Sequence, residues 1–576
     1  MSQSPQQIQV EAAVQCIVRA FEDYNASFSD ITRRAKRRFL NRDRQGMIQD
    51  INERYALYDS AINDAIERLE QILVDRLFSR AIWVQIRANY QAVTKSVSDA
   101  KLYQTFFNTL SRRLFKTTGV DAAIEFTVND RPTATSVEPR VERYDLSLDE
   151  PDDLAFLMGV LTQPWLERVI SEDPAALYRH LSTAYAMQNS QVTIEILSAC
   201  FYRAGRAYRV GRVNLDGSWL PIVFGFSMSD QGVWCEAVLT TTREISILFG
   251  YTFNYFMADL DDVEPVVGFL SQLLPSKPAA ELYTVLGRVK QGKTERFQSF
   301  FSYLLAHPEE QMMEAEGKKG MVMLVLTLPG YPVVFKLIRD RFAPSKSVTR
   351  ADVLERYHLV FKHDRVGRLI DAQEFRELKL PLEAFSPSLL DTVQTECSRV
   401  VELGSDHLLI HHCYVERRVH PLDLYLSSAP EPDALKAVMD YGQAIKDLAR
   451  SNIFAGDLLP KNFGVTGSGR VVFYDYDELR LLDECRFRHW PDTDDDVMSM
   501  SSEPWFHVGE DDVFPEQFPL FMGLAPARLQ LLSSIHGELF NPDWWQQTQA
   551  QVALGHELDV PPFGPDACIN SVQGGV

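Results

Sequence analysis

The sequence predicts an α+β protein with two domains: a mostly helical domain with a small antiparallel sheet over residues 1–310, and a bilobal domain over residues 311–576. Three observations predict this fold. A chain of 576 residues is too long for one hydrophobic core. Apolar side chains recur at helical spacing over residues 8–115 and alternate with a period of two over residues 207–239. A second change to alternation comes near residue 310.

The first domain is predicted to begin as a helical bundle, because residues 8–115 contain no proline and keep their apolar positions at helical spacing. Shorter helices are expected near residues 154–161 and 175–187. In the alternating region, Asp216-Gly217 separates two strand-like runs, which is the pattern of a two-residue β-hairpin. Helices are expected to follow through about residue 305.

The second domain is predicted to have a smaller lobe over residues 311–418 and a larger, helical lobe over residues 419–576. The segment from Glu314 to Ile338 contains a glycine-bearing turn, a strand, a Pro-Gly turn and a second strand with a lysine, and a helix follows over residues 350–362. A glycine loop, a hairpin, a lysine-bearing strand and a helix follow one another in this order in protein kinases. The sequence therefore predicts a protein-kinase-like bilobal domain.

Composition limits the partners and the compartment. A net charge of −21 and a pI near 5.1 argue against nucleic acid and anionic membranes as partners, because both repel an acidic surface. The seven cysteines lie far apart, without a C-x-x-C pair, which predicts free thiols and no disulfide. No signal peptide is visible, and the longest apolar run, Met321–Leu326, is too short for a membrane span. We expect a cytoplasmic, soluble protein.

The most informative segment is D-L-L-P-K-N-F-G-V-T-G-S-G-R-V-V-F-Y-D-Y-D, residues 457–477. Phosphoryl transfer needs a carboxylate that accepts the proton of the attacking hydroxyl, and an amide and a second carboxylate that hold metal ions. Asp457 is predicted to be the base, and Asn462 and Asp475 the metal ligands. Taken singly, each is an ordinary turn or cap residue. Their order, downstream of Lys336, favours an ATP site.

Further residues of this segment support the same chemistry. Lys461 is placed to neutralise the transferring phosphoryl group, and Asp477 offers an additional carboxylate where protein kinases have glycine. Ala455-Gly456 stands where most protein kinases have His-Arg, so the usual arginine link to an activation-loop phosphate is missing.

The nucleotide is expected to meet the smaller lobe. Lys336 lies in the apolar run V-V-F-K-L-I, where a lysine must find an anion or remain at an edge in solvent. In kinases this anion is the α/β-phosphate pair. Gly317 and Gly320 with their flanking lysines allow backbone amides to approach phosphates, although G-K-K-G alone is usually a hairpin turn. The run from Glu416 to Val419 is the candidate hinge that binds adenine.

A kinase lysine usually pairs with a helix glutamate. Glu355 is the candidate by position and Glu374 by proximity.

These blocks, together with R-V-V-F-Y-D-Y-D-E, D-R-V-G-R and S-E-P-W, resemble the isocitrate dehydrogenase kinase/phosphatase family of bacteria. The similarity is densest from Gly320 to Trp505 and includes a block over Leu239–Gly250. The resemblance implies a bifunctional enzyme that phosphorylates a serine of isocitrate dehydrogenase with ATP and removes the phosphate. This would divide isocitrate between the citric acid cycle and the glyoxylate bypass. It also implies Mg²⁺ or Mn²⁺, and AMP or ADP as allosteric or phosphatase-linked ligands.

By this match, the ATP loop falls on Ala315, Glu316, Gly317, Lys318, Lys319, Gly320 and Met321, and the ATP lysine on Lys336. The kinase-site residues fall on Asp457, Lys461, Asn462, Asp475 and Asp477. Two positions depart from the family: Glu316 replaces a proline, and Met439, next to Asp440, stands where an acidic residue is expected.

The residue linked to phosphatase action falls on Asp371. From its neighbours alone, Asp371 is a helix N-cap, because Glu374 would complete a capping box. The functional interpretation rests on the resemblance: a carboxylate near a metal and a nucleotide can orient a water for attack on phosphoserine. The acidic cluster of Asp492 and Asp494–Asp496 is interpreted as a solvated loop.

Two other functions compete. A small-molecule kinase of the aminoglycoside or choline type shares D-x-x-x-x-N and a metal aspartate without His-Arg, but the large helical first half disfavours it. A nucleotide-binding module without turnover is disfavoured because the four central residues are all retained. These four are Lys336, Asp457, Asn462 and Asp475.

Overall fold

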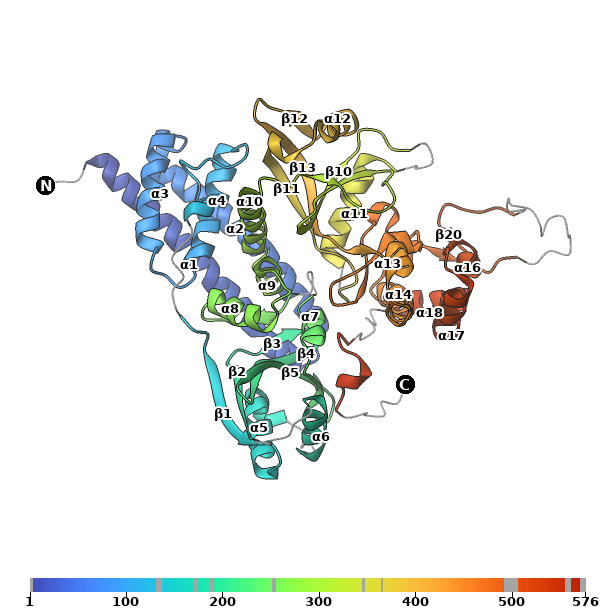
Figure 1. Ribbon diagram of the computed structural model, residues 1–576. Coiled ribbons are helices and arrows are strands. Elements are labelled where there is room, and N and C mark those ends of the chain that lie inside the picture. Colours follow the sequence, from blue (N-terminus) through green and yellow to red (C-terminus); the bar gives the residue numbers. More distant parts are fainter. Residues whose placement is uncertain are drawn as a thin grey trace. The chain divides into compact units, whose positions relative to one another are not determined.

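The computed structural model divides into two compact units (Figure 1). It describes residues 4–130, 137–168, 174–185, 191–250, 255–343, 348–363, 366–491, 506–554 and 561–569. The long N-terminal part of the first unit runs to His307, and the main part of the second unit begins at Pro308, close to the predicted boundary. One assignment differs from the predicted domain of residues 311–576: the segment 561–569 belongs to the first unit. Its Cys568 forms a β-bridge with Ala237, a pairing that no local sequence pattern announces.

The first unit begins with a bundle of four helices. They are α1 (Pro5–Leu40), α2 (Arg44–Leu73), α3 (Arg80–Thr94) and α4 (Ala100–Phe115). Ser4 starts α1 with a capping box to Gln7, which satisfies two orphan donors of the first turn. The apolar stripe of each helix faces a core rich in aromatic side chains, including the fully buried Trp83 and Tyr90. Burying this stripe holds the bundle together.

Three further helices pack beside this bundle: α8 (Val263–Leu273), α9 (Ala279–Val285) and α10 (Val289–Ala306). The buried Asp99 carboxylate accepts hydrogen bonds from the backbone N–H groups of Val263 and Glu264, and so caps the start of α8 from a distant part of the chain.

A seven-stranded antiparallel sheet completes the first unit. Its path is β1-β2-β4-β3-β7, and β5 pairs with β4 and β6. The strands are β1 (Val141–Ser147), β2 (Gln191–Leu197), β3 (Phe201–Arg203), β4 (Arg206–Leu215), β5 (Ser218–Met228), β6 (Val233–Leu239) and β7 (Met257–Ala258). The predicted hairpin is confirmed: Leu215 pairs with Ser218, and both turn residues have positive φ, at 49° for Asp216 and 86° for Gly217.

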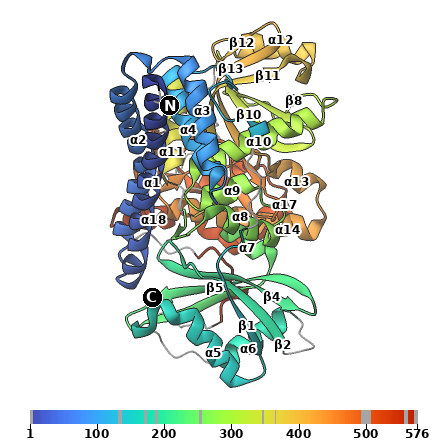
Figure 2. The ribbon, with the colours of Figure 1, turned by 90° about the vertical axis from the view of Figure 1, so that its left-hand side faces the viewer.

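Helices α5 (Pro151–Thr162) and α6 (Pro174–Ala184) cover one face of this sheet, as Figure 2 shows. A short helix, α7 (Thr242–Leu248), follows β6.

The smaller lobe of the second unit is a six-stranded antiparallel sheet with the path β11-β13-β10-β9-β8, and β12 pairs with β13. The strands are β8 (Met313–Glu314), β9 (Met323–Leu328), β10 (Tyr331–Ile338), β11 (Ala372–Pro381), β12 (Val401–Leu403) and β13 (His407–Arg417). Helices α11 (Arg350–His363) and α12 (Pro387–Glu396) accompany the sheet.

The larger lobe is helical around α14 (Glu431–Arg450), whose apolar face is fully buried. The other helices in the described part of this lobe are α13 (Leu422–Ser428), α16 (Phe518–Phe521), α17 (Pro526–His536) and α18 (Pro542–Ala553). Short strands carry the loops: β14 (His420–Pro421), β15 (Ile453–Phe454), β16 (Phe463–Val465), β17 (Val471–Phe473), β18 (Arg480–Leu481), β19 (Arg486–Phe487) and β20 (Asp512–Val513). The predicted α+β class is confirmed, with a helical first unit and antiparallel sheets in the second.

All seven cysteines are free thiols. Among the described residues, no helix combines the length and the apolar character needed to cross a bilayer.

Candidate active site

Lys336 lies in the interior of the smaller lobe and is only 5% exposed. It belongs to β10, which runs between β9 and β13. Its Nζ lies 2.8 Å from Oε2 of Glu416 on β13 and donates a hydrogen bond to the backbone oxygen of Tyr474 at 2.7 Å. The buried ammonium thus meets an anion and also contacts the residue directly before Asp475.

The expected helix glutamate is not the partner of Lys336. Glu355 is exposed on α11. Glu374 lies on β11 and bonds to His412 at 3.0 Å and to Arg376 at 2.8 Å, and the hydrogen bond from His412 is the main reason why its pKa falls to about 2. The prediction that Glu355 or Glu374 pairs with Lys336 is therefore wrong. The buried ring of Tyr357 on α11 lies near the ammonium, with its centroid 5.9 Å from Lys336 Nζ.

Glu416 supplies this carboxylate from a strand, a role that the sequence analysis missed. Burial raises its pKa, the Lys336 ammonium opposes that rise, and the charges of Asp371 and Asp475 add to it. The Glu416 carboxylate therefore lies near enough to Asp371 and Asp475 for their charges to affect its pKa. Its Oε1 is buried and makes no hydrogen bond within the described residues, so one lone-pair site of this carboxylate is open to a further donor or cation.

The predicted glycine loop joins β8 to β9 across residues 315–321, and most of it is exposed. Gly317 has a φ of 116°, and a Cβ atom there would lie 3.5 Å from Pro421 Cγ, so the loop approaches the start of the larger lobe. At Gly320, a Cβ atom would lie 2.8 Å from the backbone oxygen of Met323, which explains why this position needs glycine.

The predicted hinge is an extended link between β13 and β14. Arg418 N donates to the Pro332 oxygen at 2.9 Å, and Val419 packs so closely on Gly464 that a Cβ atom there would lie 2.3 Å from Val419 Cγ2. A role of Glu416 and Val419 in binding adenine through their backbone remains a prediction.

The catalytic segment begins after β15 with a tight turn at Gly456, where φ is 75°. The Asp457 carboxylate is about a quarter exposed and accepts a hydrogen bond from Leu459 N at 3.1 Å. Lys461, one residue before Asn462, places its Nζ 3.9 Å from the other Asp457 oxygen. A carboxylate that is held by the backbone, accessible to solvent and close to a cation is suited to accept a proton from a hydroxyl.

Asn462 ties this segment to the strand that leads to Asp475. It is 3% exposed, and its Nδ2 donates to the Asp457 backbone oxygen at 3.2 Å, which leaves the amide oxygen as the atom that can face a cation. Its own backbone oxygen accepts from Tyr474 N at 3.1 Å. The hairpin of β16 and β17 therefore brings Asn462 and Asp475 together.

The second carboxylate of D-Y-D is also buried: Asp477 is 7% exposed and lies in a short 3₁₀ turn over Tyr476–Glu478. Burial raises the pKa of Tyr357 well above its ordinary value, and the charges of Glu416, Asp477 and Asp475 contribute to the same rise. The charge of Asp477 thus acts on Tyr357, as do the charges of Glu416 and Asp475.

Asp371 is not a helix N-cap, because the strand β11 begins at the next residue. Its carboxylate is 9% exposed and accepts a hydrogen bond from Gln373 Nε2 at 3.1 Å. The segment before it runs parallel to the end of β17, with a bridge between Leu369 and Phe473. Asp371 and Asp475 therefore leave two adjacent backbone segments, and both act on Glu416.

Arg368 fastens the Asp371 segment to α14. Its guanidinium bonds to both Asp440 oxygens at 2.8 and 2.9 Å, to Asp447 at 2.8 Å and to the Val471 oxygen at 2.8 Å. Asp440, the residue after Met439, is thus paired with Arg368, which ends the segment D-R-V-G-R that carries part of the family resemblance.

The donor set fits a hard divalent cation. Asn462 offers an amide oxygen and Asp475 a carboxylate, and Mg²⁺ typically takes one or two such protein ligands and completes its shell with water and phosphate oxygens. The described residues contain no group of three or more His, Cys, Asp or Glu arranged to hold a metal ion. The acidic cluster Asp492, Asp494–Asp496 lies outside the described residues, as does Trp505.

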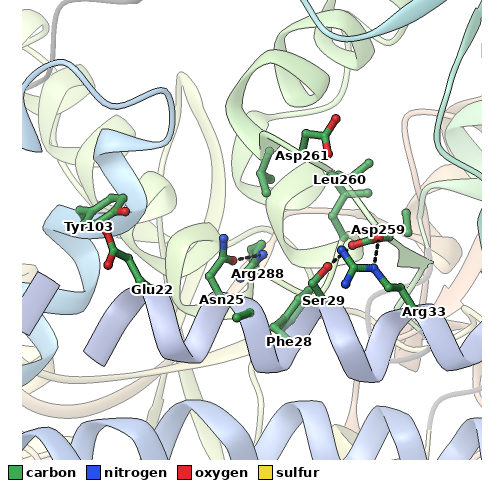
Figure 3. Close-up of a pocket in the computed structure, with 14 residues that line it drawn as sticks. Glu22, Asn25, Phe28, Ser29, Arg33, Tyr103, Asp259, Leu260, Asp261 and Arg288 are labelled. Carbon is green, nitrogen blue, oxygen red and sulfur yellow. Dashed lines mark hydrogen bonds and ion pairs between the residues drawn. The ribbon is translucent and has the colours of Figure 1, made fainter. Parts of the chain in front are cut away.

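A separate cavity of about 330 Å³ lies within the first unit, between α1 and the segment from β7 to α8 (Figure 3). Arg288 lines it and is 8% exposed, stacked 3.7 Å over the ring of Phe28, with Nη2 bonded to Asn25 at 2.6 Å. Its Nη1 is buried and has no hydrogen-bond partner within the described residues. Burial and the nearby Arg288 lower the pKa of Arg54, which also stacks on Phe28, to about 9.

Comparisons with known proteins match nearly the whole chain. Residues 14–308 match the family described as isocitrate dehydrogenase kinase/phosphatase (AceK), regulatory domain, and residues 310–565 match the kinase domain of the same family. A protein of Xanthomonas euvesicatoria pv. vesicatoria named isocitrate dehydrogenase kinase/phosphatase is 46% identical over 557 residues, 96% of each chain. Proteins of the same name from Xanthomonas campestris pv. campestris and Anaeromyxobacter sp. are 44% and 40% identical over 98% and 96% of this chain, and over 99% and 96% of their own.

Proposed function

The chain belongs to the isocitrate dehydrogenase kinase/phosphatase family, and we propose that it uses ATP to phosphorylate a serine of isocitrate dehydrogenase and removes the phosphate again at the same site. By switching that enzyme off and on, it divides isocitrate between the citric acid cycle and the glyoxylate bypass. The protein acts in the cytoplasm, which agrees with its seven free thiols.

In the kinase direction, Asp457 accepts the proton of the substrate hydroxyl while that oxygen forms its bond to the γ-phosphorus of ATP and the bond to the bridging oxygen breaks. Lys461, close to Asp457, offsets negative charge on the transferring group. Lys336 binds the α/β-phosphates, and the backbone of residues 315–321 covers them.

Asn462 and Asp475 would hold Mg²⁺ or Mn²⁺, with Asp477 as an additional carboxylate. When bound, the metal supplies positive charge that neutralises the phosphate oxygens. The adenine ring takes the hinge at Glu416–Val419.

In the phosphatase direction, Asp371 orients a water molecule toward the phosphorus of phosphoserine. The water oxygen bonds to phosphorus, the serine oxygen leaves with a proton, and inorganic phosphate is released. Since Asp371 and Asp475 lie on adjacent segments beside Lys336, one set of phosphate-binding groups can serve both reactions.

The observation that carries this proposal is the bonded path through the site. Lys336 donates to Tyr474 O, Tyr474 N donates to Asn462 O, and Asn462 donates to Asp457 O. This path supports the proposal because it links, within the second unit, the residues to which we assign phosphate binding, metal binding and proton acceptance.

The test is to incubate the protein with γ-labelled ATP, Mg²⁺ and isocitrate dehydrogenase, and then to follow release of label from the phosphorylated dehydrogenase. We expect Asp457→Ala to abolish labelling while nucleotide binding survives, and Asp371→Asn to abolish release while labelling survives. No labelling by the wild-type protein would favour a small-molecule kinase. Binding of ATP without any transfer would favour the module without turnover.

AMP and ADP are the proposed regulatory ligands, and the cavity in the first unit is the candidate site. Its size is that of small-ligand pockets, and the unpartnered Nη1 of Arg288 suits a phosphate oxygen. The carboxylates at the rim suit ribose hydroxyls: Asp259, bonded to Arg33 at 2.7 Å, and Asp261.

Arg288→Met should weaken AMP binding by roughly 10–100-fold, because a charge-assisted hydrogen bond contributes about 1.5–3 kcal/mol. Arg113→Met, an exposed helix position paired with Asp59, is the matched control. Equal affinity of both variants in a calorimetric titration would place the AMP site elsewhere.

A further inference from the structure

The hydroxyl of Tyr476 forms hydrogen bonds with both backbone groups of Ile370, its N–H and its carbonyl oxygen. Ile370 N donates to Tyr476 Oη at 2.8 Å, and Tyr476 Oη donates to Ile370 O at 2.8 Å. Both groups are in the interior, since Tyr476 is 1% exposed. Ile370 immediately precedes Asp371, and Tyr476 immediately follows Asp475. One hydroxyl therefore joins the two carboxylate-bearing segments at a single residue's distance from each carboxylate.

The segments that precede Ile370 and Asp475 are also bonded to each other farther from the two carboxylates. Phe473 N donates to the Arg368 backbone oxygen at 2.7 Å, next to the bridge between Leu369 and Phe473. From Ala372 onward the chain forms β11 and pairs with β13 instead. The Tyr476 hydroxyl thus ties the Asp371 segment to the Asp475 segment close to the point where the two separate.

We propose that Tyr476 is a positioning residue for phosphate removal: its hydroxyl fixes Asp371 relative to Asp475. The proposal rests on the role of Asp371 in the proposed function. A catalytic group displaced by about 1 Å can lose on the order of 100-fold in rate. The bonds to Ile370, the residue directly before Asp371, oppose such a displacement, in addition to the Arg368 network and the hydrogen bond from Gln373.

The hydroxyl can be separated from the ring. The ring packs edge-on against Tyr357, with centroids 5.2 Å apart, and against Phe473 at 5.9 Å, and its centroid lies 5.5 Å from Lys336 Nζ. Phenylalanine at this position keeps those ring contacts and loses the bonds of the hydroxyl, which are the two to Ile370 and a longer one to the Phe473 oxygen at 3.4 Å. The substitution therefore removes the hydroxyl that positions Asp371 and keeps the ring that packs against Tyr357 and Phe473.

The kinase direction does not depend on these bonds. Asp475 is also held through Tyr474, which donates to Asn462 O and accepts from Lys336. None of those contacts involves Ile370. Loss of the Tyr476 hydroxyl should therefore separate the two activities, whereas a general loosening of the fold would lower both.

The experiment compares Tyr476→Phe with the wild-type chain in both assays. We expect the phosphatase kcat to fall at least tenfold with the KM for phosphorylated isocitrate dehydrogenase unchanged within twofold, and the kinase kcat to stay within threefold. The control is Tyr90→Phe, which removes a buried hydroxyl that donates to Tyr103 O in the first unit. The control should lower Tm without changing the ratio of the activities. An unchanged phosphatase kcat, or an equal loss of both activities, would overturn the proposal.

Asp371→Asn, run in parallel, separates two kinds of failure. If Asp371→Asn keeps phosphatase activity, the proposed role of Asp371 fails and this inference fails with it. If Asp371→Asn loses that activity and Tyr476→Phe keeps it, only this inference fails. Hydrogen exchange on the wild-type chain gives a readout that requires no variant to fold: the amide of Ile370 should be strongly protected, and rapid exchange there would refute the bond to Tyr476.

Discussion

Lys336 and Glu416 form a buried ion pair between neighbouring strands of one sheet, with Nζ and Oε2 2.8 Å apart. Strand β10 carries the lysine and β13 the glutamate, and the two strands pair directly. Because both partners belong to the same sheet, the ammonium is positioned by strand pairing and does not need a helix to move into place. This arrangement predicts a lysine that is ready to bind phosphate whenever the sheet is folded.

Glu416→Gln should raise the KM for ATP about tenfold or more. The amide still offers an oxygen to Lys336 but no charge, so the ammonium loses its nearest counter-ion and its buried charge becomes costly. Glu374→Gln is the matched control, because Glu374 bonds to His412 and Arg376 instead. Its KM for ATP should stay within twofold of the wild type. A larger effect for Glu374→Gln than for Glu416→Gln in steady-state kinetics would contradict the strand-borne pair.

Gly456→Ala should destabilise the second unit by roughly 2–4 kcal/mol and lower the kinase kcat by about 100-fold. A Cβ atom at this position would lie 2.2 Å from the backbone oxygen of Glu478, and φ is 75°. The turn would have to shift, and Asp457, the next residue, would shift with it. Gly467→Ala is the control, since among the described residues outside its chain neighbours a Cβ atom there would meet just an Arg417 nitrogen, at 3.9 Å. Urea unfolding gives the change in the free energy of unfolding for each variant, and kinase assays give the change in kcat.

Arg368→Lys should cost about 3–5 kcal/mol of stability and should also lower phosphatase activity. A single ammonium cannot reach Asp440, Asp447 and the Val471 oxygen at once, so at least one buried carboxylate is left unpaired. The exposed Arg376→Lys should change stability by no more than about 0.5 kcal/mol. If denaturant midpoints of the two variants coincide, the Arg368 network does not hold the Asp371 segment.

The proximity of Asn462 and Asp475 could be predicted because only the short β16–β17 hairpin separates them, and a short turn with two short strands leaves few other arrangements. Asp457 lies just before this hairpin, and the roles of all three residues stay predictions. The partner of Lys336 was missed because alternation identifies the face of a strand but not which residue of a distant strand lies opposite. Glu416 is eighty positions from Lys336, and only the pairing of β10 with β13 brings them together.

Asp371 illustrates the opposite error. The run D-A-Q-E has the local chemistry of a capping box, yet residues 372–381 form a strand because they pair with β13 along its length. Tertiary pairing overrides local propensity at such positions. The Tyr476 hydroxyl could not be predicted either, since a tyrosine between two aspartates gives no indication that its oxygen reaches Ile370, more than a hundred residues earlier.

The stability of the larger lobe should depend on pH through His489. Its ring bonds to Asp543 at 2.8 Å and to Glu516 at 3.2 Å, and these hydrogen bonds, Asp543 first, raise its pKa above 6.5. Because the folded pKa exceeds the unfolded value, the added stability is fully present below pH 6.5 and is lost as pH rises through the folded pKa. Comparison of Tm for the wild type and His489→Gln should therefore show the largest difference near pH 6 and a smaller one at pH 8. Added salt should reduce the difference at pH 6, since all three side chains are exposed. A difference that is constant or grows with pH would show that His489 is not charged in this contact.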